Sequence, residues 1–382
     1  MAEARRALGP VAAARRARAR VARGRAPAPP PAPSPSVDPT RWHALLGPDA
    51  DARDRAADDV RRSDDAEDYR AALVAALGDV EAYGLAERRA AGEALDLLGD
   101  PRVTTRDPAM VAVPAGPFLM GTLEADAPGI IEQYAHAHVQ PRFLAKEMPR
   151  HEVEVDAFEI GRYPVTNGEY LEFVRATGRT PPPSWPEGSV PPGRGTHPVV
   201  RIGHDDATAY TRWLSDETGR RYRLPTEAEW EKAARGTDGR LYPWGNFFDP
   251  DRCNTLEGNT FAVLYRRARP AYGVVMRVGA FVVDRGLIGE SFDRLVATTP
   301  VGIFPHGASP YGALDMAGNA EEWVADPFGL YPGHPAEDGY DWSAEGEVCR
   351  GGAWNRPGDV ARVARRHGDF VRTGSIGLRL AR

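Results

Sequence analysis

Two cysteines are the residues of this sequence with the clearest capacity for redox or copper chemistry. Cys253 and Cys349 are the only thiols among 382 residues, and they lie far apart in the chain. Two thiols exclude a disulfide framework and a cysteine-rich zinc site. Cys349 falls in an apparent buried strand and Cys253 in a loop before Asn254, so we interpret both as small structural residues. This cysteine usage leads us to expect a reducing, cytoplasmic location.

An arginine-rich stretch near the C-terminus is the second candidate for chemistry. It reads RPGDVARVARRHGDF and contains Arg356, Arg362, Arg365 and Arg366. Guanidinium groups beside aromatic rings suit the recognition of a carboxylate or a phosphate. The stretch therefore predicts a site for an anionic ligand, although arginine is abundant throughout this chain and some of these side chains are expected to pair with nearby carboxylates.

Composition limits the classes of protein that this chain can be. The formal net charge is −6, and Lys146 and Lys232 are the only lysines among 48 basic residues, which is typical of a GC-rich bacterial coding bias. We expect no nucleic-acid binding apart from the basic N-terminal tail. No apolar run approaches the roughly 20 residues that a membrane-spanning helix needs, so we expect no membrane insertion.

The chain divides into three regions that must position these residues. Residues 1–39 are rich in Arg and Ala and then in Pro, and we predict a disordered tail. Residues 40–107 show apolar residues at helical spacing, for example Tyr69, Leu73 and Leu77, and we interpret them as a HEAT-like helical hairpin that must dock on a neighbour to bury its apolar face. The remaining region is residues 108–382.

The third region reads as short strands and helices between many Gly and Pro turns. Thr166-Asn167 predicts the start of a helix that ends at Gly178. Thr226 and Glu229 form a predicted capping box at the start of another helix. We therefore expect an irregular, loop-rich α+β domain.

A set of sequence blocks in this region carries a family resemblance. In chain order they are FLMGT (118–122), HEVEV…YPVTNGEYLEFV (151–174), HPVVRIGHDDATAYTRWL (197–214), RLPTEAEWEKAARG (223–236), YPWGN (242–246), SPYGALDMAGNAEEW (309–323), RGGAWN (350–355) and GLR (377–379). These blocks resemble the formylglycine-generating enzyme, or sulfatase-modifying factor, family. The resemblance implies a C-type-lectin-like core built largely from loops.

The resemblance also implies a copper site that this sequence does not contain. In the family's founding enzyme, two thiols after a Gly-Gly-Ser sequence bind copper(I) and activate oxygen, which converts a substrate cysteine to formylglycine. At the corresponding positions this chain has Arg356 and Ala361, with Ala353 in place of the serine. Neither a guanidinium nor a methyl group can bind copper(I). We therefore predict that copper does not bind and that the copper-thiolate reaction does not occur.

A second branch of the family, the sulfoxide synthases of ergothioneine biosynthesis, lacks the cysteine pair and uses iron. That iron is held by histidines of a separate N-terminal helical bundle. Residues 1–107 of this chain contain one histidine, His43. The three-histidine site of that branch cannot be assembled from them, so the sequence does not support iron.

Calcium is the ion that the resemblance does favour. The family carries structural calcium sites made of loop carbonyls and a few carboxylates, which are the hard oxygen ligands that calcium prefers. One expected site uses Asp315, Gly318, Ala320 and Glu322. A second uses Asn254, Thr255, Asp293 and Leu295. A salt bridge or a helix cap is the alternative role for Glu322.

Two functional hypotheses follow. The first is a ligand-binding or protein-binding module whose partner is an unknown protein or a small anionic ligand. The expected groove consists of Trp323, Trp354, Asn355, Arg356, Arg362, Arg365 and Arg366. The alternative is an oxidoreductase of the sulfatase-modifying-factor or nonheme-iron sulfoxide-synthase superfamily that acts on thiol or protein substrates with groups not recognisable in the sequence. The missing thiols favour the binding module.

Overall fold

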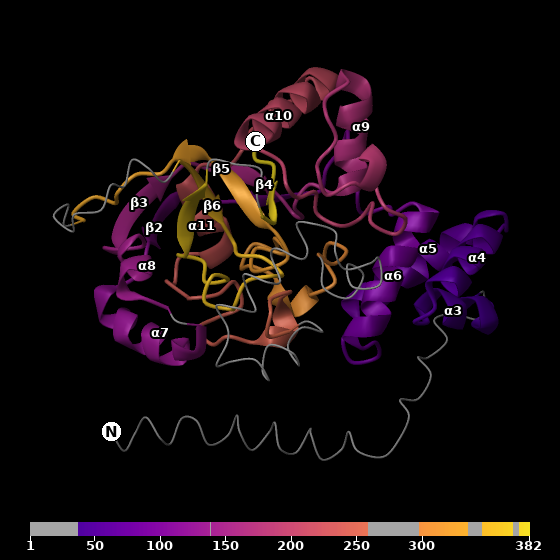
Figure 1. The fold of residues 1–382 in the computed structure, drawn as a ribbon, viewed down its shortest axis with the longest axis horizontal. Helices are drawn as coiled ribbons and strands as arrows, with labels where there is room; N and C mark the ends of the chain where they lie inside the picture. The colour runs from indigo at the N-terminus through magenta and orange to yellow at the C-terminus, as the bar shows by residue number, and fades with distance from the viewer. Residues whose placement is uncertain (1–36, 138, 259–297, 335–345, 370–373) are drawn as a thin grey trace, which may run out of the picture.

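The computed structural model describes residues 37–137, 139–258, 298–334, 346–369 and 374–382. The predicted disorder of residues 1–39 concerns almost entirely residues outside these ranges. Four helices come first, and together they form the helical unit at one end of the molecule (Figure 1). They are α3 (Pro39–Leu46), α4 (Ala50–Arg61), α5 (Ala66–Gly78) and α6 (Leu85–Leu98).

The helical unit has four helices where the sequence predicted a hairpin. The side chains of Asp38 and Asp49 accept backbone hydrogen bonds at the starts of α3 and α4. The buried face of α4 consists mainly of Ala56, Ala57 and Val60, and such small residues give little apolar periodicity to detect. Helix α3 has only 8 residues, which is too short for an apolar period to be recognised in the sequence.

The helical unit docks on the rest of the chain through α6. Ile303 and Phe304 belong to the same buried cluster as the cores of the four helices. Gly92 on α6 allows a close approach, because a Cβ at this position would lie 2.4 Å from the Pro300 ring. The Gly195 backbone N–H also donates to Asp96 Oδ2 over 2.9 Å. The neighbour on which the predicted hairpin had to dock is therefore the rest of the same chain.

Three small sheets follow, and the described residues form no barrel. In two of them, antiparallel pairs join β1 (Met110–Val113) to β4 (Phe158–Gly161) and β2 (Gly116–Met120) to β3 (His151–Val155). The third sheet has the order β7-β6-β5-β8, with only β5 and β8 parallel. Its strands are β5 (Glu321–Pro327), β6 (Glu347–Arg350), β7 (Arg366–Asp369) and β8 (Ile376–Leu378).

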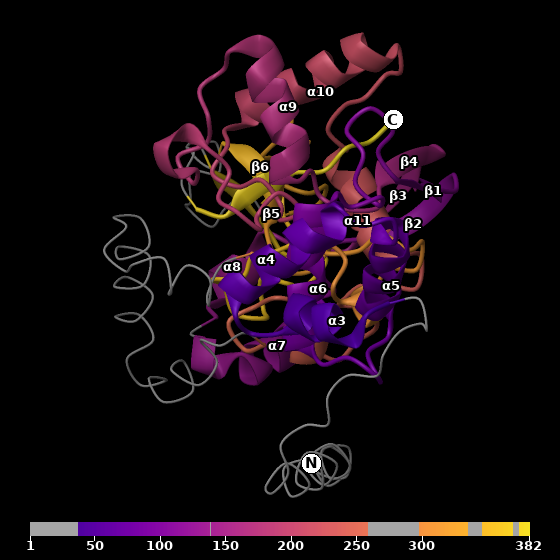
Figure 2. The same cartoon turned by 90° about the vertical axis from the view of Figure 1, so that its right-hand side faces the viewer.

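Helices surround these sheets, and α9 and α10 lie together at one end of the molecule (Figure 2). They are α7 (Ala127–Gln133), α8 (Pro141–Ala145), α9 (Asn167–Thr177), α10 (His204–Thr218) and α11 (Glu227–Arg235). Single 3₁₀ turns occupy Glu124–Asp126, Ala135–Ala137, Pro186–Gly188, Pro250–Arg252 and Pro305–Gly307. The predicted cap of α9 at Thr166, its end at Gly178 and the capping box of α11 are confirmed.

The four-stranded sheet separates two cores. On one face, Trp323 of β5 and Cys349 of β6 face each other and pack with aromatic residues of α9 and α10. On the other face, Val324 and Val348 pack with Trp230 of α11. Strand β6 contributes Cys349 to one core and Val348 to the other, so the turn that follows β6 begins between these two cores. In the described part of the chain, no helix is both long and apolar enough to cross a membrane.

Candidate functional site

The turn after β6 is built on two glycines that no other residue could replace easily. Gly351 and Gly352 have φ angles of 97° and 71°, which L side chains rarely adopt. A Cβ at Gly351 would lie 3.1 Å from the Trp230 ring. The Gly318 N–H donates to the Gly351 carbonyl over 2.8 Å, and the Trp354 N–H donates to Asn319 O over 3.2 Å. This turn is therefore hydrogen-bonded directly to residues 315–319, which we call the DMAGN loop.

The two thiol positions of this turn are in opposite environments. Arg356 is exposed, and its guanidinium makes no hydrogen bond or ion pair with any described residue. Ala361 is fully buried and packs with Cys253 and Ala317 in a small apolar cluster. Ala353 is also fully buried. A copper(I) ion finds no thiolate at either position, so these residues do not fit the family's copper site.

The two cysteines are buried in different places. Cys349 lies on β6, as predicted, and packs in the core beneath α9 and α10. Cys253 packs beside Ala361, and burial raises the pKa of its thiol. Because the two thiols belong to separate clusters, they do not form a two-coordinate site, although Cys253 lies next to one of the original thiol positions.

The arginines after the turn do not gather in one groove with Arg356. Arg362 is buried and ion-paired with Glu147, and Arg366 is buried and ion-paired with Glu227. Arg365 is half-buried and donates to Phe143 O over 3.2 Å. Their partners come from segments more than a hundred positions away, so the sequence pattern could not reveal them.

The aromatic members of the expected groove are buried as well. Trp323 is 1 % exposed and donates its indole N–H to Ile202 O over 2.9 Å. Trp354 is 9 % exposed. Asn355 is half-buried, and its Oδ1 is buried without a hydrogen-bond partner among the described residues. Of the seven groove residues, only Arg356 is exposed.

A buried carboxylate that sequence reasoning missed lies next to this turn. Glu321 of β5 is 2 % exposed, and its Oε1 lies 3.7 Å from Nδ1 of His367 on β7. Burial lowers the pKa of His367, Glu321 opposes that shift, and the positive charges of Arg356 and Arg365 add to it. The imidazole is therefore neutral near pH 7, and Arg356 supplies the positive charge at the surface of this turn.

The first expected calcium site does not offer a free carboxylate. Glu322 accepts hydrogen bonds from Arg379 Nη2 over 2.7 Å and from Arg379 Nε over 2.9 Å. It also accepts a hydrogen bond from the Trp230 indole N–H over 2.6 Å. The salt bridge is thus the role that the structure gives Glu322. Asp315 accepts hydrogen bonds from Gly302 N and Asn319 Nδ2. A calcium ion here would have to displace a buried guanidinium, so this set fits the ion poorly.

The second expected calcium site is only partly described. Asn254 and Thr255 are buried, and Asn254 forms a bridge to Gly318. The two expected sites are therefore neighbours. Asp293 and Leu295 lie outside the described residues. Within the ranges that the structure describes, no group of three or more His, Cys, Asp and Glu side chains is arranged to hold a metal.

Comparison with known proteins gives consistent relatives. Residues 98–382 match the family described as the sulfatase-modifying factor enzyme 1-like domain. The chain is 32% identical over 275 residues to a formylglycine-generating enzyme of Mycobacterium tuberculosis, covering 59% of this chain and 75% of that protein. It is 32% identical over 337 residues to the mouse inactive C-alpha-formylglycine-generating enzyme 2, covering 75% of this chain and 90% of that protein.

A third relative has a different activity in its name. The chain is 31% identical over 281 residues to the hercynine oxygenase of Mycobacterium tuberculosis, covering 63% of this chain but only 56% of that protein. Among solved structures, PvdO from Pseudomonas aeruginosa is 28% identical with a TM-score of 0.48, covering 73% of this chain and 95% of that one.

Proposed function

The chain belongs to the sulfatase-modifying factor enzyme 1-like family, and from that premise we propose that it is a binding module that recognises a carboxylate, and not a copper-dependent formylglycine generator. The observation that carries the proposal concerns the two thiol positions: one holds Arg356, which is exposed and pairs with no described residue, and the other holds the buried Ala361. A relative named as inactive supports the loss of the reaction in one branch of the family. We also propose, from the family resemblance, a C-type-lectin-like core, and from the cysteine usage a cytoplasmic location.

The surroundings of Arg356 suit a carboxylate on an exposed surface. The neighbouring arginines are already engaged by Glu147 and Glu227, so Arg356 is the guanidinium that can exchange water for a ligand. Phe248 packs on Gly358 of the same turn, and the adjacent Phe247 is 86 % exposed. The turn carries an exposed cation, and the segment that packs on it carries an exposed aromatic residue, so we infer a ligand that has both an acidic and an apolar part.

The binding experiment uses Arg356→Ala with Arg55→Ala as its control, because Arg55 is also exposed but lies on α4 of the helical unit. The probes are a peptide that alternates Glu and Phe and the free dicarboxylate succinate, which separate a protein partner from a small anion. We expect R356A to weaken binding about tenfold, as the loss of one charge-assisted hydrogen bond would do, and R55A to leave it unchanged. Equal affinities of R356A and the unaltered protein would contradict the proposal.

The reaction itself is tested separately. Purified protein is incubated with copper(I), oxygen, a reductant and a cysteine-containing sulfatase-type peptide, and the peptide mass is followed. We expect no loss of mass from thiol-to-aldehyde conversion. Formation of aldehyde that disappears in Cys253→Ala or Cys349→Ala would show that a buried thiol takes part.

The names of two relatives favour an oxidoreductase as the second candidate function. Such a reaction would need groups from residues outside the described ranges or from another subunit. Oxygen consumption with thiol substrates, together with metal analysis of the purified protein, tests this candidate. Metal-dependent oxygen uptake would favour it over the binding module.

A further inference from the structure

Arg235, the last residue of α11, has a buried guanidinium whose hydrogen bonds are only partly made. Its side chain is 0 % exposed, and its Nη1 donates to the carbonyls of Leu119 and Gly121, both over 2.7 Å. Its Nε and Nη2 are buried and have no hydrogen-bond partner among the described residues. These two atoms form one side of the planar guanidinium, which we call the Nε–Nη2 edge. Three buried N–H groups of Arg235 therefore lack an acceptor.

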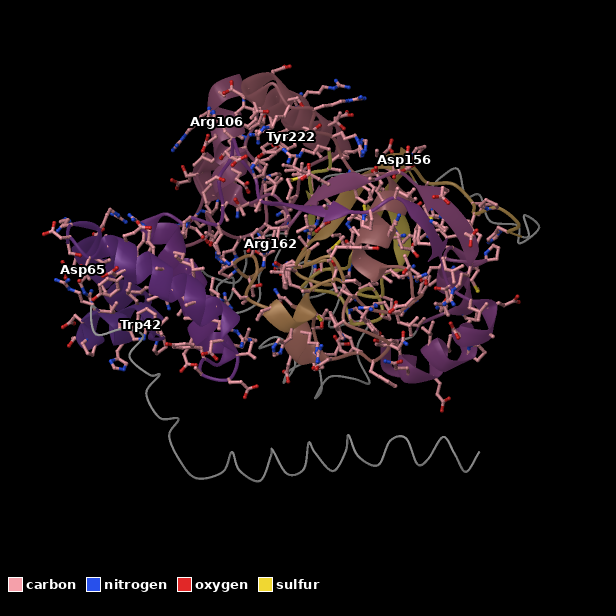
Figure 3. The ribbon with its side chains drawn as sticks, turned by 180° about the vertical axis from the view of Figure 1, so that it is seen from behind. Trp42, Asp65, Arg106, Asp156, Arg162 and Tyr222 are labelled. Carbon is pink, nitrogen blue, oxygen red and sulfur yellow. The ribbon has the colours of Figure 1, made fainter. Side chains whose placement is uncertain are left out.

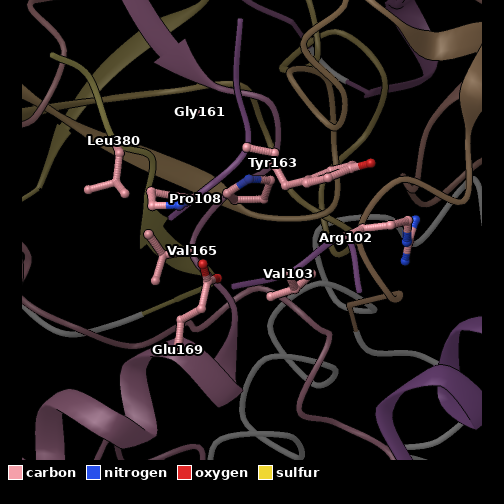
Figure 4. Close-up of a pocket in the computed structure, with 10 residues that line it drawn as sticks. Arg102, Val103, Pro108, Gly161, Tyr163, Val165, Glu169 and Leu380 are labelled. Carbon is pink, nitrogen blue, oxygen red and sulfur yellow. The ribbon is translucent and has the colours of Figure 1, made fainter. Parts of the chain in front are cut away.

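Another arginine of this chain shows what the same edge ordinarily binds. Arg102 lies beside the small hollow of Figure 4, and its Nε and Nη2 donate to the two oxygens of Asp100 over 3.0 and 2.6 Å. A guanidinium without such a partner is tolerated in water. Arg162, labelled in Figure 3, makes no hydrogen bond or ion pair with a described side chain, but it is exposed. The Nε–Nη2 edge of Arg235 has neither a carboxylate nor access to solvent.

The ion pairs around Arg235 contain one guanidinium more than they contain carboxylates. Glu231 pairs with Arg235 over 3.1 Å and also with Arg350. Glu227 pairs with Arg366 over 2.6 Å and with Arg350 over 3.2 Å. All five residues are buried, and none is more than 6 % exposed. Three positive and two negative charges leave a net charge of 3 − 2 = +1 in this network, and a buried charge without a counter-charge is costly.

The other groups near Arg235 do not supply the missing negative charge. Burial lowers the pKa of Arg235, Glu231 opposes that shift, and the positive charges of Arg150 and Arg350 add to it. A guanidinium nevertheless stays protonated in a protein. Burial holds the pKa of Tyr331 well above its ordinary value, so the phenol is neutral. The charges that act on Arg235 from outside its own ion pair are therefore positive.

Tyr331, which follows β5, contributes another buried donor at the same place. Its ring lies against Gly121, because a Cβ at that glycine would be 3.2 Å from Tyr331 Cε2. The carbonyl of Gly121 is also the acceptor for Arg235 Nη1. The Tyr331 hydroxyl is buried without a hydrogen-bond partner among the described residues. Donors from two separate segments are thus left without an acceptor beside one glycine, next to a network that is one negative charge short.

We propose that the Nε–Nη2 edge of Arg235 binds a chloride ion inside the protein, with the Tyr331 hydroxyl as a further donor. A net charge of +1 is balanced by a monovalent anion, and a divalent phosphate or sulfate would leave an excess of negative charge. A single-atom anion also suits donors that solvent does not reach, because it needs less space than a molecule with a carboxylate. Chloride is larger than fluoride and therefore loses its water at a lower cost. None of these residues belongs to the turn that carries Arg356.

The test compares thermal unfolding of the full chain in sodium chloride and in sodium gluconate at equal ionic strength, which separates binding from screening. We expect chloride to raise the melting temperature by several degrees, with a dependence on its concentration that follows binding to the folded state. In crystals grown in sodium bromide, we expect a peak of anomalous scattering beside Nε and Nη2 of Arg235. Equal melting temperatures in the two salts, or ordered water in place of bromide at this edge, would overturn the proposal.

Three variants locate the effect. Tyr331→Phe keeps the ring and every charge but removes one donor, so the chloride concentration that gives half of the effect should rise about fivefold. Arg162→Ala removes an exposed guanidinium and should leave the response to chloride unchanged. Arg235→Met removes the excess positive charge, and a folded R235M protein should not respond to chloride. If R235M does not fold, Y331F and the bromide peak decide. A response of full size in folded R235M, or an unaltered half-effect concentration in Y331F, would overturn the proposed site.

Discussion

The carboxylate of Glu147 accepts hydrogen bonds from both terminal nitrogens of Arg362, over 2.6 and 2.8 Å, and neither side chain is more than 1 % exposed. The two residues are 215 positions apart, and Thr122 Oγ1 adds a third hydrogen bond to the same carboxylate. Burial alone would raise the pKa of Glu147, but Arg362 and then Arg365 more than offset it, so this pKa lies below its ordinary value. The pair joins the loop before β3 to the turn that follows β6.

Breaking this pair should be costly. Glu147→Gln leaves the Arg362 guanidinium buried without a counter-charge, so we expect the free energy of unfolding in urea to fall by about 3–5 kcal/mol. Replacing both residues by Met should recover much of that loss, because no buried charge is left behind. As a control, Asp58→Asn removes a half-exposed pair with Arg61 and should cost less than about 1 kcal/mol. If E147Q also costs less than about 1 kcal/mol, the Arg362 guanidinium must reach solvent in that variant, which would contradict the prediction.

This pair also shows why some features could be predicted from the sequence and others could not. The capping boxes at Thr166 and Thr226 connect residues three positions apart, so the sequence itself contains both partners. The partners of Arg362 and Arg366 lie 215 and 139 positions away, and spacing carries no information about them. The expected groove therefore contained residues that the fold uses internally. The alternative of a salt bridge at Glu322 could be named from the sequence, but Arg379 as its partner could not.

Gly92 tests how closely the helical unit is docked. Ala is favoured over Gly inside a helix by roughly 1 kcal/mol. At Gly92, however, the new Cβ would lie 2.4 Å from the Pro300 ring, which is too rigid to move aside. We expect Gly92→Ala to lower the free energy of unfolding by about 1–3 kcal/mol despite the gain in propensity. The matched control is Gly78→Ala at the end of α5, where nothing lies within 4 Å of the new Cβ and the change should be neutral or stabilising. Equal effects of the two changes would contradict this close contact.

Glu169 should make stability depend on pH in an unusual direction. Burial raises the pKa of Glu169 to about 7 in the folded protein, whereas an unfolded glutamate titrates near 4.3. The protonated carboxyl therefore favours the folded state, so this contribution is fully present below about pH 4 and is lost as the pH rises through about 7. Glu169→Gln lacks the titration. Between pH 4 and pH 8 its free energy of unfolding should improve by about 3 kcal/mol relative to the unaltered protein. Urea unfolding curves that shift in parallel at every pH would contradict this pKa.

Calcium remains a prediction for the second expected site. Asn254 and Thr255 are buried against the DMAGN loop, whereas Glu322 of the first site is neutralised by Arg379. We expect EDTA to lower the melting temperature by several degrees and calcium to restore it. Asp293→Asn should abolish that response. Glu322→Gln should lower stability without changing the response to calcium. A melting temperature that EDTA does not alter, with no calcium found by elemental analysis, would remove the prediction.

The two thiols should be unreactive in the native protein. A thiol reacts with disulfide reagents and binds copper(I) as the thiolate, and it must be accessible to do so. Cys349 is fully buried on β6, and Cys253 is 2 % exposed. Burial raises the pKa of the Cys253 thiol, and the nearby charge of Glu257 raises it further. We therefore expect a chromogenic disulfide reagent to label neither cysteine in the native chain, and both after unfolding in guanidinium chloride. Cys349→Ser and Cys253→Ser identify which thiol any native labelling comes from. Rapid labelling of Cys253 would contradict this prediction and would show that solvent reaches the thiol beside Ala361. Cys253 would then be available as a nucleophile at this turn.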